Sequence, residues 1–272
     1  MAVADAPSVA IVIPARFAST RFPGKPLTRF RGADGTARTL IEHSWRAASA
    51  FTGASTIVVA TDDERIAREV ESFGGSVVMT PADCRNGTER CAAALPAIPG
   101  DADIIVNLQG DAPLTPPDIL SAVVARLGAD PYLPVATPAI RCTPTVYRHL
   151  ADDAAAGRVG GTTVVFNRHH DALYFSKRIL PYVDPEQARE QTPDVYLHLG
   201  IYAYRRAALT AYVDAGPCQL EQQEGLEQLR FLDAGLRVGV ALCEPPAWDV
   251  IEVNNPGDAP LVEAILRRRD AR

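Results

Sequence analysis

The sequence predicts an α/β fold: a mostly parallel sheet covered by helices on both faces, with a smaller lobe rich in strands. Short apolar runs bounded by turn residues recur along the first half of the chain, and segments with helical patterns separate them. Nearly continuous hydrophobic strands are expected in a parallel sheet with both faces covered. With 272 residues, 47% of them hydrophobic, the chain can form one large domain or a core with a smaller lobe.

The first part of the chain supplies the expected parallel sheet. We expect strands at residues 8–13, 55–60, 76–79 and 103–108, and helices between them at about 38–51, 63–73 and 87–95. Ligands of such sheets gather at the carboxyl ends of the strands. The sheet therefore brings four polar segments to one edge: residues 14–25, 61–62, 80–86 and 109–111.

The pattern changes between residues 138 and 217. Strand-like runs at 162–166, 172–175 and 198–204 follow one another there without long helices until the end. A helix over 220–234 with Gly235 as its stop, a strand at 237–242 and a helix over 256–269 complete the expected elements. We therefore expect a core at 1–137, a β-rich lobe at 138–217 and a return to the core at 218–272.

Composition and charge exclude several classes of protein. A formal net charge of -6 argues against nonspecific nucleic-acid binding, which needs a basic face. The N-terminus lacks a basic segment followed by an apolar one, and no apolar run approaches the roughly 20 residues of a membrane span. The five cysteines show no CxxC spacing and fit neither a closed disulfide set nor a zinc site. We expect a cytoplasmic protein without nucleic-acid or membrane partners.

The first strand leads into a basic loop. The chain from residue 6 to residue 33 has no acidic side chain and five basic ones: Arg16, Arg21, Lys25, Arg29 and Arg31. Such cations, with amides freed at a turn, hold phosphate oxygens through charge-assisted hydrogen bonds of roughly 1.5–3 kcal/mol each. The loop therefore predicts a triphosphate site, although a solvated basic loop is the simpler alternative. The absence of GxxxxGK[ST] and GxGxxG patterns argues against an ATPase and an NAD-dependent dehydrogenase.

Two further segments at this edge carry candidate ligands. Asp111 follows a strand, so its carboxylate is expected beside the basic loop, where Mg²⁺ can neutralise charge on a reacting phosphate. Alternatively, Asp111 only caps the next helix. Residues 86–88 begin a helix whose N–H groups can bind an anion or the edge of a base. Alternatively, Thr88 is a simple N-cap.

Together these segments resemble the 3-deoxy-manno-octulosonate cytidylyltransferases, a branch of the nucleotide-sugar transferase superfamily. The resemblance spans nearly the whole chain, and its most specific pieces are residues 14–27, 59–62, 86–90, 106–111, 174–176, 198–202 and 226–230. It implies a Rossmann-like sheet and a Mg²⁺-dependent reaction of CTP with the anomeric 2-hydroxyl of 3-deoxy-manno-octulosonate or a close ulosonic acid, giving the CMP-sugar and pyrophosphate. It also implies a nucleotide-binding core, a lobe for sugar binding and dimerisation, and a homodimer.

The resemblance carries over to particular residues. Lys25, Arg16 and Asp111 would be catalytic, with Lys25 the first candidate. The expected nucleotide-binding residues are Pro14, Ala15, Arg16, Ser19, Arg21, Lys25, Asn86, Gly87, Thr88 and Gln109. The expected sugar-binding residues are Lys177, Arg178, His198, Tyr202, Glu227 and Gln228, with Lys177 or Arg178 facing the carboxylate. Tyr202 and His198 can instead be packed interior residues, and Glu227 and Gln228 plain surface positions of a helix.

The chain departs from the family pattern at three positions. Ala112 stands where most members have glutamate, and Lys177 where they have arginine, which alters how a carboxylate is held. Asn254 stands where a second metal-binding aspartate is usual; we expect its carbonyl oxygen to bind Mg²⁺ with Asp111, and Asp258 is the competing candidate. The alternative functions are another sugar nucleotidyltransferase, such as a uridylyltransferase, and a catalytically silent nucleotide-sugar binding module.

Overall fold

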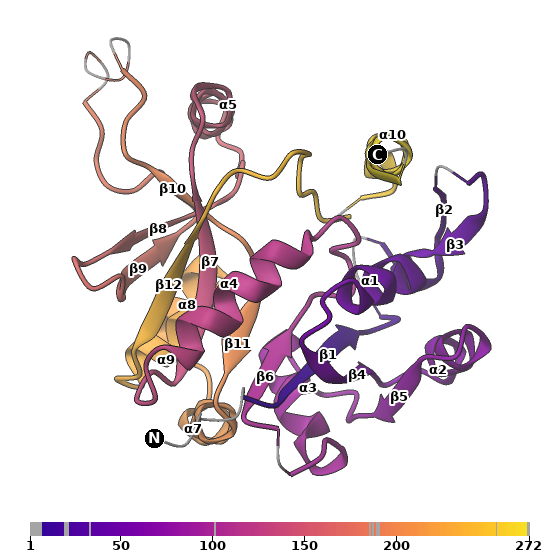
Figure 1. Cartoon of the computed structure of the whole chain (residues 1–272). Coiled ribbons are helices and arrows are strands. Elements are labelled where there is room, and N and C mark those ends of the chain that lie inside the picture. Colours follow the sequence, from indigo (N-terminus) through magenta and orange to yellow (C-terminus); the bar gives the residue numbers. More distant parts are fainter. Residues whose placement is uncertain are drawn as a thin grey trace, which may run out of the picture. The chain divides into compact units, whose positions relative to one another are not determined.

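The structure is a computed structural model that describes residues 7–18, 22–32, 34–100, 102–184, 186, 188, 191–253 and 255–270. Ser19, Arg21 and Asn254, three of the predicted binding residues, lie outside the described residues. The chain divides into two compact units (Figure 1). We call Met1–Ser121 with Pro246–Arg272 the core unit, and Ala122–Pro245 the lobe unit.

The core unit is built on parallel strands in the order β5–β4–β1–β6. These strands are β1 (Val9–Ala15), β4 (Ala54–Thr61), β5 (Ser76–Met79) and β6 (Ile104–Asn107). Strand β1 pairs in parallel with both β4 and β6, and all its residues are buried. A strand enclosed in this way must be apolar throughout, which explains the unbroken hydrophobic runs in the sequence.

Helices cover both faces of this sheet. They are α1 (Leu40–Ser49), α2 (Glu64–Ser72) and α3 (Gly87–Ala94). The chain steps in one direction from β1 through β4 to β5, and then crosses back to β6. Because parallel crossovers are right-handed, α3 lies on the face opposite to α1 and α2. Their N-caps are Thr39, Asp63 and Asn86, whose side chains accept hydrogen bonds from backbone amides of the first turn.

The remaining elements of the core unit are short helices, a hairpin and the last helix of the chain. They are the short helices η1 (Lys25–Leu27), η2 (Leu95–Ala97) and η3 (Pro256–Asp258), the hairpin of β2 (Arg29–Arg31) and β3 (Ala37–Thr39), and α10 (Ala259–Asp270). Val262, Ile265 and Leu266 of α10 are buried in one cluster with Phe30 and Leu40. This cluster attaches the last segment of the chain to the core unit.

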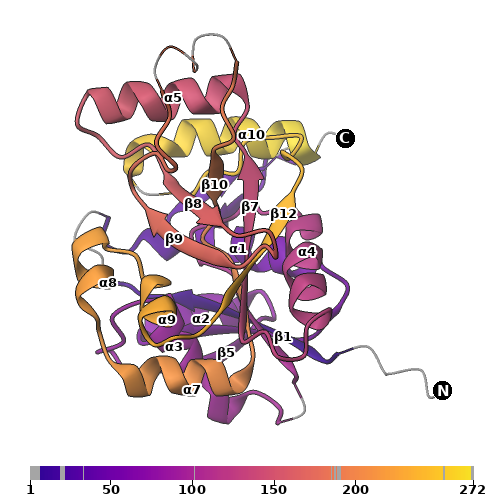
Figure 2. The same cartoon turned by 90° about the vertical axis from the view of Figure 1, so that its left-hand side faces the viewer.

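The lobe unit contains a mixed sheet in the order β11–β7–β10–β8–β9, and Figure 2 labels the last four of these strands. Its strands are β7 (Val135–Arg141), β8 (Thr162–Phe166), β9 (Ala172–Ser176), β10 (Tyr196–His198), β11 (Tyr202–Tyr204) and β12 (Val238–Cys243). Strand β12 pairs in parallel with β7, and the other pairs are antiparallel. Its helices are α5 (Pro144–Ala155), α7 (Arg206–Ala215), α8 (Gln219–Glu224) and α9 (Leu229–Asp233), while α4 (Pro117–Gly128) crosses the unit boundary.

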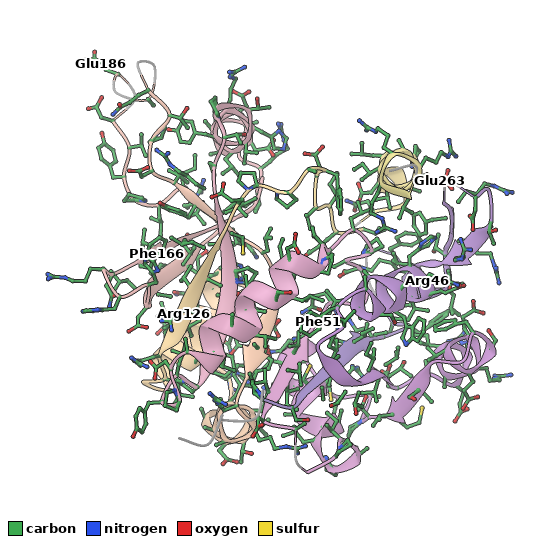
Figure 3. All side chains as sticks on the ribbon, viewed as in Figure 1. Arg46, Phe51, Arg126, Phe166, Glu186 and Glu263 are labelled. Carbon is green, nitrogen blue, oxygen red and sulfur yellow. The ribbon has the colours of Figure 1, made fainter. Side chains whose placement is uncertain are left out.

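The turn between β8 and β9 is anchored from α4. Arg126 donates hydrogen bonds to the carbonyl of His169 and to the carboxylate of Asp171, both at 3.3 Å (Figure 3 labels Arg126 and, on β8, Phe166). The backbone amide of Val240 in β12 donates to the carbonyl of His170 at 2.7 Å. The hairpin is therefore held at its turn as well as along its strands.

The organisation of the lobe differs from the sequence expectation in four respects. The boundaries between the units fall near residues 121 and 245 of the chain, and were expected near 137 and 217. The pairing of β7 with β12 places both strands in the lobe unit. The expected strand at 198–204 is two strands, β10 and β11. The expected helix at 220–234 breaks at Gly225, where φ is 61°. Helix α5 occupies a region expected to lack long helices, although Thr143 as N-cap and Pro144 in the first turn are regular helix starts.

Within the described parts of the chain, no helix combines the length and the apolar character needed to cross a membrane.

Candidate functional site

A polar pocket lies at the carboxyl ends of β1 and β6 in the core unit. It is formed by the loop after β1, the start of η1, the turn before α3 and the turn after β6. Eight of the predicted residues line it: Pro14, Ala15, Arg16, Lys25, Asn86, Gly87, Gln109 and Asp111. The structure thus brings together segments that are as much as 97 positions apart in the chain.

Lys25 and Asp111 form an ion pair inside this pocket. The ammonium of Lys25 lies 2.5 Å from Asp111 Oδ2 and also donates a hydrogen bond to the carbonyl of Val253 at 2.8 Å. The two side chains are 16% and 24% exposed, so both remain accessible to a ligand. The pocket therefore presents a cation and a carboxylate within contact of each other, as expected if one site handles both a phosphate and its metal ion.

The turn after β6 places Asp111 through a close approach at Gly110. The Gly110 amide donates to the carbonyl of Pro14 at 3.2 Å, and a Cβ at Gly110 would stand only 2.7 Å from that oxygen. The hydroxyl of Ser44 holds the Gly110 carbonyl from the other side at 2.9 Å. Only glycine allows this turn to press against the end of β1, and the turn then delivers Asp111 to Lys25.

The opposite wall of the pocket is the first turn of α3. The side chain of Asn86 accepts from the Glu89 amide at 2.8 Å, so Asn86 is the N-cap and the alternative assignment of that role to Thr88 is wrong. A Cβ at Gly87 would stand 2.8 Å from Gln109 Nε2, which shows how closely the Gln109 amide lies against this turn. Thr88 is fully buried and does not line the pocket. The wall presents amide groups suited to the edge of a base.

Arg90 and Arg85 also line the pocket, and neither was predicted. Arg90 is 3% exposed; its guanidinium donates to Thr80 Oγ1 at 2.6 Å and lies 3.5 Å from Asp62. Residues three apart share one face of a helix. The spacing from Gly87 to Arg90 therefore could have revealed this additional cation.

In the lobe unit, three predicted sugar-binding residues lie together in the interior. The rings of His198 and Tyr202 are 5.6 Å apart, and the Tyr202 hydroxyl donates to Gln228 Oε1 at 3.1 Å. Gln228 is 1% exposed, so its assignment to a plain surface position is wrong. Among the described residues its Nε2 has no hydrogen-bond partner. A buried donor of this kind costs free energy unless a ligand satisfies it.

His198 is a neutral member of this group. Burial lowers the pKa of His198 to about 3. Its Nε2 lies 2.8 Å from the hydroxyl of Thr137, which donates in turn to the carbonyl of Ile201 at 2.7 Å. A ring held in this way offers hydrogen bonds, not charge, to a ligand.

The other predicted sugar-binding residues are less enclosed. Lys177 and Arg178 are exposed and line a second hollow with Tyr174, Gln223 and Glu224. Glu227 is half-buried in the turn between α8 and α9. The lobe unit thus offers an interior group of neutral polar side chains and a separate group of cations.

The donor set of the core pocket fits Mg²⁺ that arrives with a phosphate ligand. Within the described residues, no group of three His, Cys, Asp or Glu side chains could hold a metal ion. Mg²⁺ is usually bound by one or two carboxylates with water and substrate phosphates supplying the other ligands. Asp111 offers one such carboxylate beside the cations. Asp258, the competing candidate, accepts from the Asn255 amide at 2.7 Å.

A parallel sheet with cations, one carboxylate and amide groups gathered at its strand ends is the arrangement of a nucleotide-binding α/β transferase. The chain matches the family model for cytidylyltransferases over residues 10–238. It belongs to the cytidylyltransferase family.

Individual relatives align along most of their length. The chain is 45% identical over 259 residues to 3-deoxy-manno-octulosonate cytidylyltransferase of Maricaulis maris, covering 95% of the chain and 97% of the relative. It is 38% identical to 8-amino-3,8-dideoxy-manno-octulosonate cytidylyltransferase of Shewanella halifaxensis, covering 95% and 98%. A solved structure of CMP:2-keto-3-deoxy-manno-octonic acid synthetase complexed with CTP aligns with a TM-score of 0.82 at 33% identity, covering 96% and 99%. The predicted α/β fold and the family resemblance are confirmed.

Proposed function

We propose that this protein joins CTP to the anomeric 2-hydroxyl of 3-deoxy-manno-octulosonate or a close ulosonic acid, giving the CMP-sugar and pyrophosphate. The observation that carries the proposal is the contact of Lys25 with Asp111 at 2.5 Å in a pocket also formed by Gln109 and the first turn of α3. The CTP-bound structural relative and the names of the sequence relatives support it.

The cations of the pocket suit the charge that develops in this reaction. As the bond from the α-phosphorus to pyrophosphate lengthens, negative charge grows on the leaving group. Lys25, Arg16 and Arg90 all line the pocket, so positive charge is already in place when it is needed. Bound Mg²⁺ would neutralise charge on the reacting phosphate, and Asp111 is the residue that would hold it.

The lobe unit supplies groups that suit an acidic sugar. The orphaned Nε2 of Gln228 is a donor for a sugar hydroxyl or carboxylate oxygen, and Tyr202 orients that amide through its Oε1. Neutral His198 adds a hydrogen-bonding ring without charge. Lys177 and Arg178 are cations of the kind that a carboxylate requires.

The direct test is a matrix of nucleotides and acceptors. The purified protein is incubated with Mg²⁺, one of CTP, UTP, ATP or GTP, and 3-deoxy-manno-octulosonate or its 8-amino-3,8-dideoxy analogue. Pyrophosphate release and the product mass are then measured. We expect turnover with CTP and an ulosonic acid, and loss of turnover when EDTA removes the metal. Turnover with UTP and a sugar phosphate instead would contradict the proposal, and CTP binding without pyrophosphate release would favour a silent binding module.

The cytoplasmic location and the homodimeric state stay predictions from the sequence. Sedimentation analysis of the purified chain measures the second directly.

A further inference from the structure

Lysine is rare in this chain. Of its 27 lysine and arginine residues, two are lysines, Lys25 and Lys177. Lys25 lines the core pocket, and Lys177 lines the hollow of the lobe unit. A compact ammonium on a flexible stem differs from a guanidinium in size and in the hydrogen bonds it forms. The contacts around Lys177 therefore indicate which kind of ligand its ammonium binds.

The end of β9 is fastened to the end of α8 by one carboxylate. Glu224, the last residue of α8, accepts from the Ser176 hydroxyl at 2.7 Å through Oε1 and from the Lys177 backbone amide at 3.1 Å through Oε2. Tyr174, two positions before Ser176 on the same strand, also hydrogen-bonds Glu224, and burial together with the charge of Glu224 raises the pKa of that tyrosine. Hydrogen bonds to a carboxylate are stronger than neutral ones, so Glu224 holds the backbone at Lys177.

The residue after Glu224 makes room for the ammonium. Gly225 ends α8 with φ at 61°, in the left-handed region. A Cβ placed on Gly225 would stand 2.8 Å from Lys177 Nζ. The ammonium thus lies over the bare backbone of Gly225, in space that every other residue would fill. Because Nζ is the free end of a flexible side chain, a methyl group here would displace the ammonium, in addition to the backbone strain that any side chain meets at this φ.

The same turn carries the buried amide of the candidate sugar site. Gln228, three positions after Gly225, is buried in the lobe unit, and its Nε2 has no partner among the described residues. The turn from 225 to 228 therefore carries the backbone beneath the Lys177 ammonium and, three positions later, a buried neutral donor. A carboxylate is the ligand that an exposed ammonium recognises.

We propose that Glu224 and Gly225 are positioning residues that hold the Lys177 ammonium for the carboxylate of the acidic sugar. Glu224 fixes the backbone at Lys177, and Gly225 leaves the space in which the ammonium lies. Arg178 lines the same hollow and is the other candidate for this role. The inference rests on the proposed function, because it assigns a part to residues of that same site.

The chain offers a matched pair of glycine variants. Gly235 has φ at 73° and follows α9, and no atom of the described residues lies within 4 Å of a Cβ placed on it. Gly225→Ala and Gly235→Ala therefore impose the same kind of backbone strain, but Gly225→Ala alone displaces Lys177. We expect Gly225→Ala to raise the KM for 3-deoxy-manno-octulosonate about tenfold and to leave the KM for CTP unchanged within twofold. Gly235→Ala should leave both constants unchanged, and equal effects of the two variants would overturn the role of Gly225.

The role of Glu224 is tested through its dependence on Lys177. Glu224→Gln replaces one acceptor oxygen with an NH2 group, which cannot accept a hydrogen bond. We therefore expect a rise of about five- to tenfold in the KM for the sugar, with kcat changed less than threefold. Since Glu224 acts through Lys177, adding Glu224→Gln to Lys177→Met should cause no further rise. A further multiplicative rise in the double variant would show that Glu224 acts independently and would contradict the inference.

Limited acetylation with peptide mass spectrometry gives a readout that does not depend on turnover. In the wild type, 3-deoxy-manno-octulosonate should slow acetylation of Lys177 at least fivefold, and CTP should slow that of Lys25. Gly225→Ala should lose the protection of Lys177 and keep that of Lys25. Protection of Lys177 with no difference between the two glycine variants would overturn the inference alone. A wild type in which neither ligand protects either lysine would overturn the proposed function as well.

Discussion

Replacement of Lys25 by methionine removes the cation that contacts Asp111 and keeps most of the side-chain volume. In the unliganded chain the Lys25–Asp111 pair is only partly buried, with exposures of 16% and 24%. An ion pair with this much solvent contributes at most about 1 kcal/mol to folding. In the transition state the same ammonium faces charge that is growing on the leaving group, where loss of one preplaced contact costs about 3–4 kcal/mol. Lys25→Met should therefore lower kcat about a hundred- to thousandfold and leave the melting temperature nearly unchanged.

Pyrophosphate release at saturating CTP and sugar measures this effect, and thermal unfolding monitored by circular dichroism checks the fold. Arg237→Met is the matched control. Arg237 forms an ion pair of the same length, 2.5 Å to Asp130, and lines neither pocket. It should lose no more than a small amount of stability and keep its kcat. A folded Lys25→Met protein with kcat within tenfold of the wild type would refute the electrostatic reasoning.

Three further outcomes follow from the geometry. Asp111→Asn keeps an oxygen ligand but loses the charge, so the Mg²⁺ concentration for half-maximal pyrophosphate release should rise at least tenfold; an unchanged Mg²⁺ dependence would remove Asp111 as a ligand. Gly87→Ala places a Cβ 2.8 Å from Gln109 Nε2, so calorimetry should show CTP binding weakened about tenfold, the value of about one hydrogen bond. Burial lowers the pKa of His198 to about 3, so below about pH 6.5 the unfolded chain takes up a proton that the folded chain does not, and stability falls as the pH drops toward 3. Between pH 6.5 and 5 this amounts to about 2 kcal/mol, which denaturant unfolding should show for the wild type and not for His198→Gln; parallel losses in both proteins would contradict it.

Several features of the candidate site could be predicted because they depend on local order in the chain. The parallel strands of the core unit are nearly continuous apolar runs, and the residues after them must emerge at the same edge. The adjacency of Lys25 and Asp111 follows from that rule, because both follow strands that pair in parallel in the same sheet. The residue that caps α3 was left open because Asn86 and Thr88 are both common at helix starts, and the structure shows that it is Asn86.

Other features depend on contacts between distant segments, which the local sequence pattern does not predict. Arg90 faces the pocket since it is bound to Thr80 and lies near Asp62, which belong to different parts of the chain. The helix expected over 220–234 has suitable periodicity, but Gly225 adopts a left-handed conformation there and the Lys177 ammonium occupies the freed space. Glu224 was overlooked for the same reason, because its donors lie at and just after the end of β9, almost fifty positions earlier in the chain.

The order of strands and helices in the core unit, and the edge at which phosphate chemistry would take place, were therefore determined by the sequence itself. Hydrophobic periodicity and turn residues act over a few positions and are visible in one dimension. Only the tertiary structure decided which cations enter the pocket, where the lobe unit begins and how Lys177 is held. Those outcomes depend on burial and on hydrogen bonds between segments that are distant in the sequence. Such contacts form only when the chain folds.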